Sequence, residues 1–322
     1  MTDMAYETPQ LPLDLAAFPA QVSSRMQELA RGLDESLRAP VLGLVDRPGK
    51  ALRALLVAAC AAPDKAARRI LVRLGAIVEL IHMASLLHDD VVDKAPSRRG
   101  APAAHTVVGA ELAALAGLSC FALAGMEAAS VGGGAEVLAS RASAGLSYGQ
   151  VLDVERAFDT VLAIDDYVEL AARKTGDLFR LSCLLGAAAA QADPVTGQRL
   201  GEFGLHFGIA FQVLDDCLDF QADGTGKPFG LDHLRGLFGA PTLYALRSDG
   251  DGGLAELLLS PGFSIADMPL VKTLVTKSGG LQAARELARQ HRTLALEALG
   301  SVQDAEVSRR VMAVLAFQGW AS

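Results

Sequence analysis

The stretch LLHDDVVDKAP, from Leu86 to Pro96, places three aspartates at the end of a strongly apolar segment. Asp89 and Asp90 lie four and three residues before Asp93, so a helix would place all three on one face. Three like charges on one helical turn oppose helix formation and raise each other's pKa. A solvated acidic face would lessen that cost, but the neighbouring leucines and valines predict a buried helix. A divalent cation would remove the repulsion.

The same pattern returns in LDDCLDF, from Leu214 to Phe220, with Asp215, Asp216 and Asp219. One such motif could equally be a charged helix end, but two copies that end long apolar helices favour metal binding. Carboxylate oxygens suit Mg²⁺, which keeps water ligands and is often completed by substrate phosphates. Zinc is disfavoured because no cysteine or histidine stands at ligand spacing.

The composition indicates a globular, helical protein. The chain has 322 residues, of which 51% are apolar and 20% charged, which is typical of a packed core rather than disorder. Alanine and leucine dominate, and this favours helix. The net charge of −8, without a basic stripe containing aromatics, argues against nucleic acid as a partner.

Cellular location is predicted to be cytoplasmic. The four cysteines are far apart and read as reduced core thiols. The first ten residues, MTDMAYETPQ, lack the apolar run of a signal peptide. The longest uncharged helical stretch, Leu112 to Met126, is shorter than the ~20 residues that a membrane span needs. We therefore expect no membrane span.

Helical periodicity runs through most of the chain, with breaks at glycine- and proline-rich segments. No break is long enough for a linker, which predicts an all-α fold in one domain, residues 1–322. The expected helices are Ala16–Leu37, Lys50–Ala61, Asp64–Asp93, Thr106–Ala129, Ala135–Glu155, Ile164–Gln191, Pro194–Phe220, Asp232–Leu246, Leu254–Leu259, Gly280–Leu299 and Asp304–Phe317.

The two acidic segments, ELIHMASLLHDDVVDKAPSRRG and FGIAFQVLDDCLDF, resemble the aspartate-rich motifs of the trans-isoprenyl diphosphate synthases, or polyprenyl synthetases. The resemblance implies a single bundle of long helices around a deep apolar cavity, the isoprenoid synthase type I fold, as a homodimer. It also implies a head-to-tail prenyltransferase that condenses isopentenyl diphosphate with an allylic diphosphate. In that family Mg²⁺, three ions with substrate bound, is held by both aspartate motifs.

Basic residues that match the family's isopentenyl diphosphate ligands are Lys50 and Arg53 in RPGKALRA, His82 in ELIH, and Arg99 in SRRG. Lys50 and Arg53 are three residues apart and share a helical face, although an exposed amphipathic turn would give the same spacing. A lone histidine on an apolar helix is usually a core residue, so the role of His82 depends on the resemblance.

The allylic diphosphate would be bound, by the same resemblance, by Arg98, by Lys174 in ARKTGDLF and by Lys227 in GTGKPFGLD. Thr175 follows Lys174 and precedes a glycine, a pair that can open a helix and free a carbonyl. The resemblance gives Lys174, Thr175 and Gln212 catalytic roles around the developing carbocation. A helix defect with a surface lysine is the alternative.

The chain departs from the family pattern in GLFGAP, residues 236–241. Leu237 stands where a lysine that binds diphosphate is usual, and Gly239 where a threonine is usual. One missing charge-assisted contact would cost about 1.5–3 kcal/mol. Arg235 is close enough in sequence to substitute. Leu118 similarly replaces a usual aspartate.

Product length is predicted from Ala84 and Ser85, five and four residues before Asp89 and about one helical turn deeper. Aromatic residues there would stop the product early, by the resemblance, and both are small here, so we expect twenty carbons or more. Two alternatives remain open. A class I terpene cyclase would need no second diphosphate site, and a non-catalytic partner subunit would have little reason to keep six motif aspartates.

Overall fold

The computed structural model describes residues 11–61, 66–220 and 230–320. These residues divide into two compact units, within Met1–Ser143, Leu178–Glu202 and Ala298–Ser322 for unit 1, and Ala144–Asp177 and Phe203–Glu297 for unit 2. In this part of the chain the only strands are β1 (Ser97–Arg98) and β2 (Ala101–Pro102), which form an antiparallel hairpin. The all-α prediction is confirmed, and the prediction of a single domain stays a prediction.

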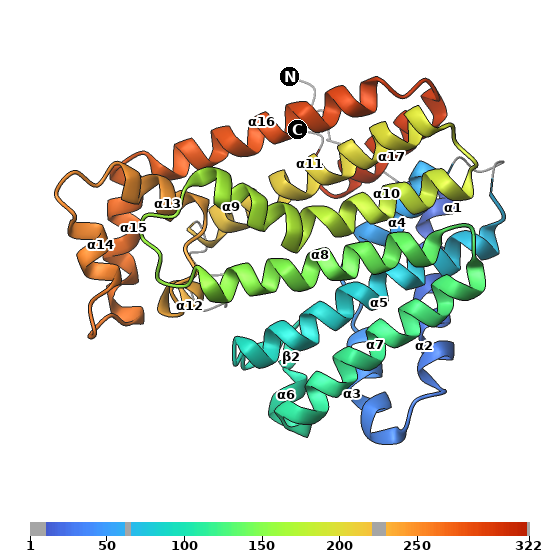
Figure 1. Cartoon of the computed structure of the whole chain (residues 1–322), viewed down its shortest axis with the longest axis horizontal. Coiled ribbons are helices and arrows are strands. Elements are labelled where there is room, and N and C mark those ends of the chain that lie inside the picture. The colour runs from blue at the N-terminus through green and yellow to red at the C-terminus, as the bar shows by residue number, and fades with distance from the viewer. Residues whose placement is uncertain (1–10, 62–65, 221–229, 321–322) are drawn as a thin grey trace, which may run out of the picture. The chain divides into compact units, whose positions relative to one another are not determined.

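Unit 1 is built around α5, which ends in the first aspartate motif. The long helix α7 packs along α5, and α2 and α4 also contact it (Figure 1). The elements of unit 1 are α1 (Leu13–Ala16), α2 (Phe18–Ala30), α3 (Glu35–Val45), α4 (Leu52–Cys60), α5 (Arg68–Val92), α6 (Ala104–Val108), α7 (Ala110–Val131) and α17 (Ala305–Phe317).

Unit 2 has its own apolar core, in which Val213 and Cys217 pack with Tyr167, Leu243 and Val271. Its helices are α9 (Ile164–Ala171), the π-helical η1 (Ala172–Gly176), α12 (Leu231–Leu234), α13 (Ala240–Arg247), α14 (Gly253–Leu258), the 3₁₀ turn η2 (Ile265–Asp267) and α15 (Met268–Lys277). Four helices have residues in both units: α8 (Ala135–Glu155), α10 (Asp177–Ala189), α11 (Pro194–Asp219) and α16 (Gly280–Gly300).

Several predicted helices are wrong in extent. The helix expected over Ala16–Leu37 stops at Ala30, and a new helix, α3, starts after Asp34, whose carboxylate accepts a hydrogen bond from the Ser36 N–H at 3.0 Å. The expected Asp232–Leu246 helix is split into α12 and α13, since Gly236 adopts a φ of +73°. Helix α15 was not predicted.

Helices α5 and α7 are long and apolar enough to cross a membrane by length and composition alone. Of the most apolar window of each, 61% is buried inside the protein for α5 and 44% for α7. Core helices of globular proteins meet the same criteria. The exposed residues of α7 matter below, because they include Leu115, Leu118 and Met126.

Candidate active site

The first aspartate motif lies at the C-terminal end of α5 in unit 1. Asp90 is buried, and its Oδ1 accepts a hydrogen bond from Arg98 Nε at 2.8 Å. Asp89 and Asp93 are partly exposed. Burial opposes the charge of Arg98, but the hydrogen bond to Asp90 and the negative charges of the three motif aspartates together outweigh it and raise the pKa of this guanidinium. The structure thus brings together one predicted metal ligand and one predicted diphosphate ligand.

The hairpin that follows α5 separates the two adjacent arginines. Arg98 lies in β1, whereas Arg99 adopts a left-handed conformation with φ of +50°. The guanidinium of Arg99 donates to the carbonyl oxygen of Arg47 at 2.7 Å, in the loop before α4. Arg98 and Arg99 therefore have different partners within unit 1, and their separate binding roles stay a prediction.

The predicted isopentenyl diphosphate residues form a basic cluster in unit 1. Burial, and then the positive charges of Arg53, Arg99 and Arg98, hold the pKa of His82 well below its usual value, so its imidazole is neutral. Arg53 lies in the first turn of α4, with its guanidinium carbon 4.4 Å from the centre of the Phe179 ring. Lys50 is exposed just before this helix. Arg53 and Arg99 thus lie close enough to His82 to act on its charge, and their role in binding an anion stays a prediction.

In unit 2 the segment ARKTG is a π-helical turn between α9 and α10, as the threonine–glycine pair indicated. Lys174 forms an ion pair with Asp153 of α8. Helix α8 packs very close to this turn at Gly149, which has no side chain. A Cβ atom at this position would lie only 2.9 Å from the backbone nitrogen of Lys174. Asp153 lies in the segment YGQVLDV, which also resembles the family, but the sequence did not predict its ion pair with Lys174.

Thr175 and Gln212, both predicted catalytic residues, are joined directly in unit 2. Thr175 is buried, and its hydroxyl donates to Gln212 Oε1 at 2.7 Å. The other end of the same amide, Nε2, donates to Asp216 Oδ1 at 2.9 Å. The π-turn is thereby connected to the second aspartate motif through one glutamine side chain.

Asp216 of the second motif is held by several hydrogen bonds. Its Oδ2 accepts hydrogen bonds from the Tyr167 hydroxyl at 2.6 Å and from the Ala240 N–H at 3.1 Å. Burial raises the pKa of Asp216 to about 7, although these donors and Gln212 act against it. Gly239 allows the close approach of the backbone, because a Cβ there would lie 2.5 Å from Asp216 Oδ2. Tyr167 is a site residue that the sequence analysis missed.

The comparisons with known proteins place this geometry in a family. Residues 34–263 match the model of the polyprenyl synthetase family. This chain belongs to the polyprenyl synthetase family. It is 33% identical over 304 residues to nonaprenyl diphosphate synthase from Mycobacterium tuberculosis, covering 92% of this chain and 90% of that protein. It is 32% identical over 281 residues to a prenyl transferase from Porphyra purpurea, covering 85% and 86%.

Solved polyprenyl synthases share the fold. The polyprenyl synthase from Caulobacter crescentus CB15, complexed with calcium and isoprenyl diphosphate, matches with a TM-score of 0.84, 30% identity and coverage of 96% and 94%. A decaprenyl diphosphate synthase from Rhodobacter capsulatus matches with a TM-score of 0.83 and 26% identity, covering 96% of this chain and 98% of that one. The predictions of a trans-isoprenyl diphosphate synthase, a prenyltransferase, and of the isoprenoid synthase fold are confirmed.

A polyprenyl synthetase needs divalent cations as well as a diphosphate site. Before substrate binds, the motif carboxylates described here supply only some of the ligands that Mg²⁺ requires. Asp215 and Asp219 are exposed on one face of α11, but Asp216 is held by three donors. No three Asp, Glu, His or Cys side chains in the described residues come together as a metal site. Mg²⁺ would therefore need diphosphate oxygens and water to complete its six ligands.

After the second aspartate motif the family usually has two lysines that bind diphosphate, and this chain keeps only the first of them. Lys227 lies outside the described residues. Leu237, in the usual place of a second lysine, is partly buried, and its N–H donates to the Asp232 carbonyl at 2.9 Å. Arg235, considered as a substitute, has its guanidinium 3.5 Å from the Asp232 carboxylate, within the same short turn.

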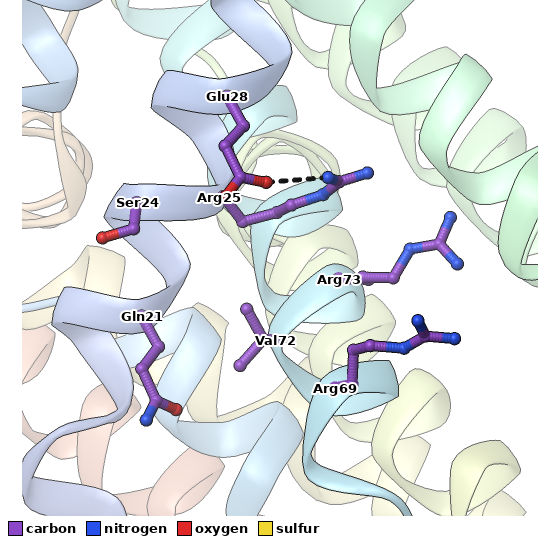
Figure 2. A pocket seen from close by; sticks show the side chains of 7 residues that line it. All are labelled: Gln21, Ser24, Arg25, Glu28, Arg69, Val72 and Arg73. Atoms are coloured by element: carbon purple, nitrogen blue, oxygen red, sulfur yellow. Dashed lines mark hydrogen bonds and ion pairs between the residues drawn. The ribbon is translucent and has the colours of Figure 1, made fainter.

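The predicted chain-length residues lie inside α5. Ala84 is fully buried, and Ser85 is partly buried with its hydroxyl donating to the His82 carbonyl at 2.7 Å. A separate surface pocket of about 610 Å³ lies between α2 and α5 in unit 1, where Figure 2 shows the side chains of Arg25, Arg69 and Arg73. It contains none of the predicted site residues.

Proposed function

We propose that this polyprenyl synthetase condenses isopentenyl diphosphate with an allylic diphosphate to give a trans-polyprenyl diphosphate of twenty carbons or more. The observation that carries the proposal is the cluster of Arg53, His82 and Arg99 in the same unit as the first aspartate motif. A terpene cyclase would have no need for this second diphosphate site. The names of the relatives, nonaprenyl and solanesyl diphosphate synthases, support a long product.

Each group of residues has a distinct task in the proposed reaction. Lys50, Arg53, His82 and Arg99 bind isopentenyl diphosphate, and Arg98, Lys174 and Lys227 bind the allylic diphosphate. The six motif aspartates are assigned to Mg²⁺: Asp89, Asp90, Asp93, Asp215, Asp216 and Asp219. Asp90 and Asp216 also accept hydrogen bonds, from Arg98 and Tyr167, that hold the two motifs in place. Three Mg²⁺ ions with substrate bound would stabilise the negative charge that develops on the leaving diphosphate.

The chain's own residues prepare the site for ionisation of the allylic substrate. Lys174 is placed by Asp153, and the π-turn that carries it is a feature often found at functional sites. Thr175 and Gln212 fix each other, so they need no reorganisation during the reaction. The deprotonation that ends the reaction is assigned to the departing diphosphate, so no side chain is required as the base.

We further propose a homodimer formed through α7. Leu115, Leu118 and Met126 are spaced by three and eight residues on this helix and are 48%, 59% and 67% exposed, which together form an apolar stripe on one face. Leu118 replaces the family's usual aspartate and extends that stripe. Light scattering on Met126→Asp should report a monomer where the unaltered protein is a dimer. An unchanged mass would exclude this face.

Product analysis tests the function directly. The purified chain is incubated with isopentenyl diphosphate and dimethylallyl, geranyl or farnesyl diphosphate, with Mg²⁺ or with chelator. We expect products longer than farnesyl diphosphate and none with chelator. A hydrocarbon without incorporation of labelled isopentenyl diphosphate would indicate a cyclase. An inactive chain that is activated by a second protein would indicate a partner subunit. A cytoplasmic location, also proposed, is tested by cell fractionation.

A further inference from the structure

Glu79 is an acidic residue among the cations proposed to bind isopentenyl diphosphate. It lies on α5, three residues before His82 and on the same helical face. Its Oε1 accepts a hydrogen bond from the backbone N–H of Ala54 in α4 at 3.2 Å. Burial raises the pKa of Glu79, while the charges of Arg53 and Arg99 act in the opposite direction. A carboxylate in an anion-binding site needs an explanation, because it repels the ligand.

The contact with Ala54 provides a hydrogen-bond acceptor for the first turn of α4, which its own N-cap residue does not provide. The residue at its N-cap, Ala51, is in the left-handed conformation with φ of +47° and offers no side-chain oxygen to the first N–H groups of the helix. A helix start without such an acceptor loses about 1 kcal/mol. Glu79 supplies the acceptor from a neighbouring helix, and its negative charge also suits the positive end of the helix dipole. The first turn of α4 is thereby attached to α5.

The attached turn carries Arg53. The Nε of this arginine is buried and has no hydrogen-bond partner among the described residues. Burial lowers the pKa of Arg53 to about 10, and Glu79 is the acidic group that works against this effect. Arg99 interacts with the same carboxylate through its charge. Without Glu79, two nearby guanidinium groups would repel each other across a helix start that has lost its cap.

We propose that Glu79 is a positioning residue of the isopentenyl diphosphate site, which holds Arg53 and Arg99 in place without touching the substrate. The inference rests on the proposed function. It reverses the simple electrostatic expectation: if Glu79 acted only as a nearby negative charge, its removal would tighten diphosphate binding. If Glu79 positions the two arginines, its removal weakens binding.

Calorimetry with isopentenyl diphosphate alone tests this, because that substrate does not react without an allylic partner. We expect Glu79→Ala to raise the dissociation constant about tenfold, the loss of one charge-assisted hydrogen bond. Glu79→Gln keeps an oxygen for the Ala54 N–H and should stay within about threefold of the unaltered protein. Glu79→Asp keeps the charge but is too short to reach Ala54, so it should resemble the alanine variant. The exposed Glu35→Ala is the control.

The Michaelis constant for the allylic substrate should not change in any of these variants, which separates positioning of this site from a general loss of structure. Equal or tighter binding by Glu79→Ala would overturn the inference. If that variant does not fold, the order of Glu79→Gln and Glu79→Asp decides, and tighter binding by the aspartate variant overturns it. If the unaltered protein binds no isopentenyl diphosphate, the proposed function itself fails.

Discussion

Removing the hydroxyl of Tyr167 should loosen the second aspartate motif while leaving the surrounding packing intact. The hydroxyl donates to Asp216 Oδ2 at 2.6 Å, and the ring is buried in the core of unit 2. Tyr167→Phe keeps the ring, so no large cavity forms. Because burial raises the pKa of Asp216 to about 7, the measurements are made at about pH 8.5, where the carboxylate is charged and such a hydrogen bond contributes about 1.5–3 kcal/mol.

The expected loss in free energy of unfolding is about 2 kcal/mol, because Asp216 keeps its bonds from Gln212 at 2.9 Å and Ala240 at 3.1 Å. For a chain of 322 residues, whose unfolding entropy is about 2.1 cal/mol/K per residue, that corresponds to a fall in Tm of about 3 °C. Since Gln212 joins Asp216 to Thr175, we also expect kcat to fall about three- to tenfold with little change in the Michaelis constant for isopentenyl diphosphate.

Thermal unfolding followed by circular dichroism and steady-state incorporation of labelled isopentenyl diphosphate measure the two effects. Tyr148→Phe is the matched control, because Tyr148 is in the same unit and exposed. If Tyr167→Phe equals this control in both Tm and kcat, the hydrogen bond to Asp216 does not hold the motif, and the reasoning is refuted.

Three further predictions concern product length, diphosphate binding and pH. Ala84→Phe should shorten the products seen by mass spectrometry, since Ala84 is fully buried in α5; an unchanged product distribution would contradict the length argument. Leu237→Lys should raise kcat/KM for the allylic substrate about tenfold by adding a charge-assisted contact, whereas the exposed Leu218→Lys should not. Burial opposes ionisation of Glu127, but hydrogen bonds from two arginines outweigh it and lower the pKa of this carboxyl. Glu127 therefore stabilises the folded protein fully above its unfolded pKa near 4.5, and this contribution is lost as the pH falls through the lower folded pKa. Unfolding of Glu127→Gln, measured over the same pH range, should lack this loss of stability.

The sequence predicts the helical class and the motif helices because apolar periodicity and paired aspartates are local signals. It fails where a contact overrides such a signal. The helix α3 contains Pro40 in its interior, and this residue is buried with Val41 and Val45. Tertiary packing compensates there for the hydrogen bond that proline removes. The 3₁₀ turn η2, which leads directly into α15, did carry a local signal, the capping box between Ser264 and Asp267.

The site residues could likewise be predicted only where the interacting residues are close together in the sequence. The π-turn could be predicted, because Thr175 and Gly176 are adjacent in sequence. Tyr167 could not, because its partner Asp216 is 49 residues away and nothing near Tyr167 resembles a motif. Asp153 and Glu79 lay inside recognised segments, but their roles depend on which helix packs opposite them.

The π-turn of Ala172–Gly176 makes the length of the chain, as well as its composition, part of the active site. A π-turn contains about one residue more than an α-turn. Deleting Ala172 would remove this extra residue, so a regular helix could form while α10 keeps its orientation. Lys174 and Thr175, inside the turn, would each move relative to Asp153 and Gln212, although every one of these residues would still be present. A single codon deletion at this point would thus lower the activity with all of its motifs still recognisable.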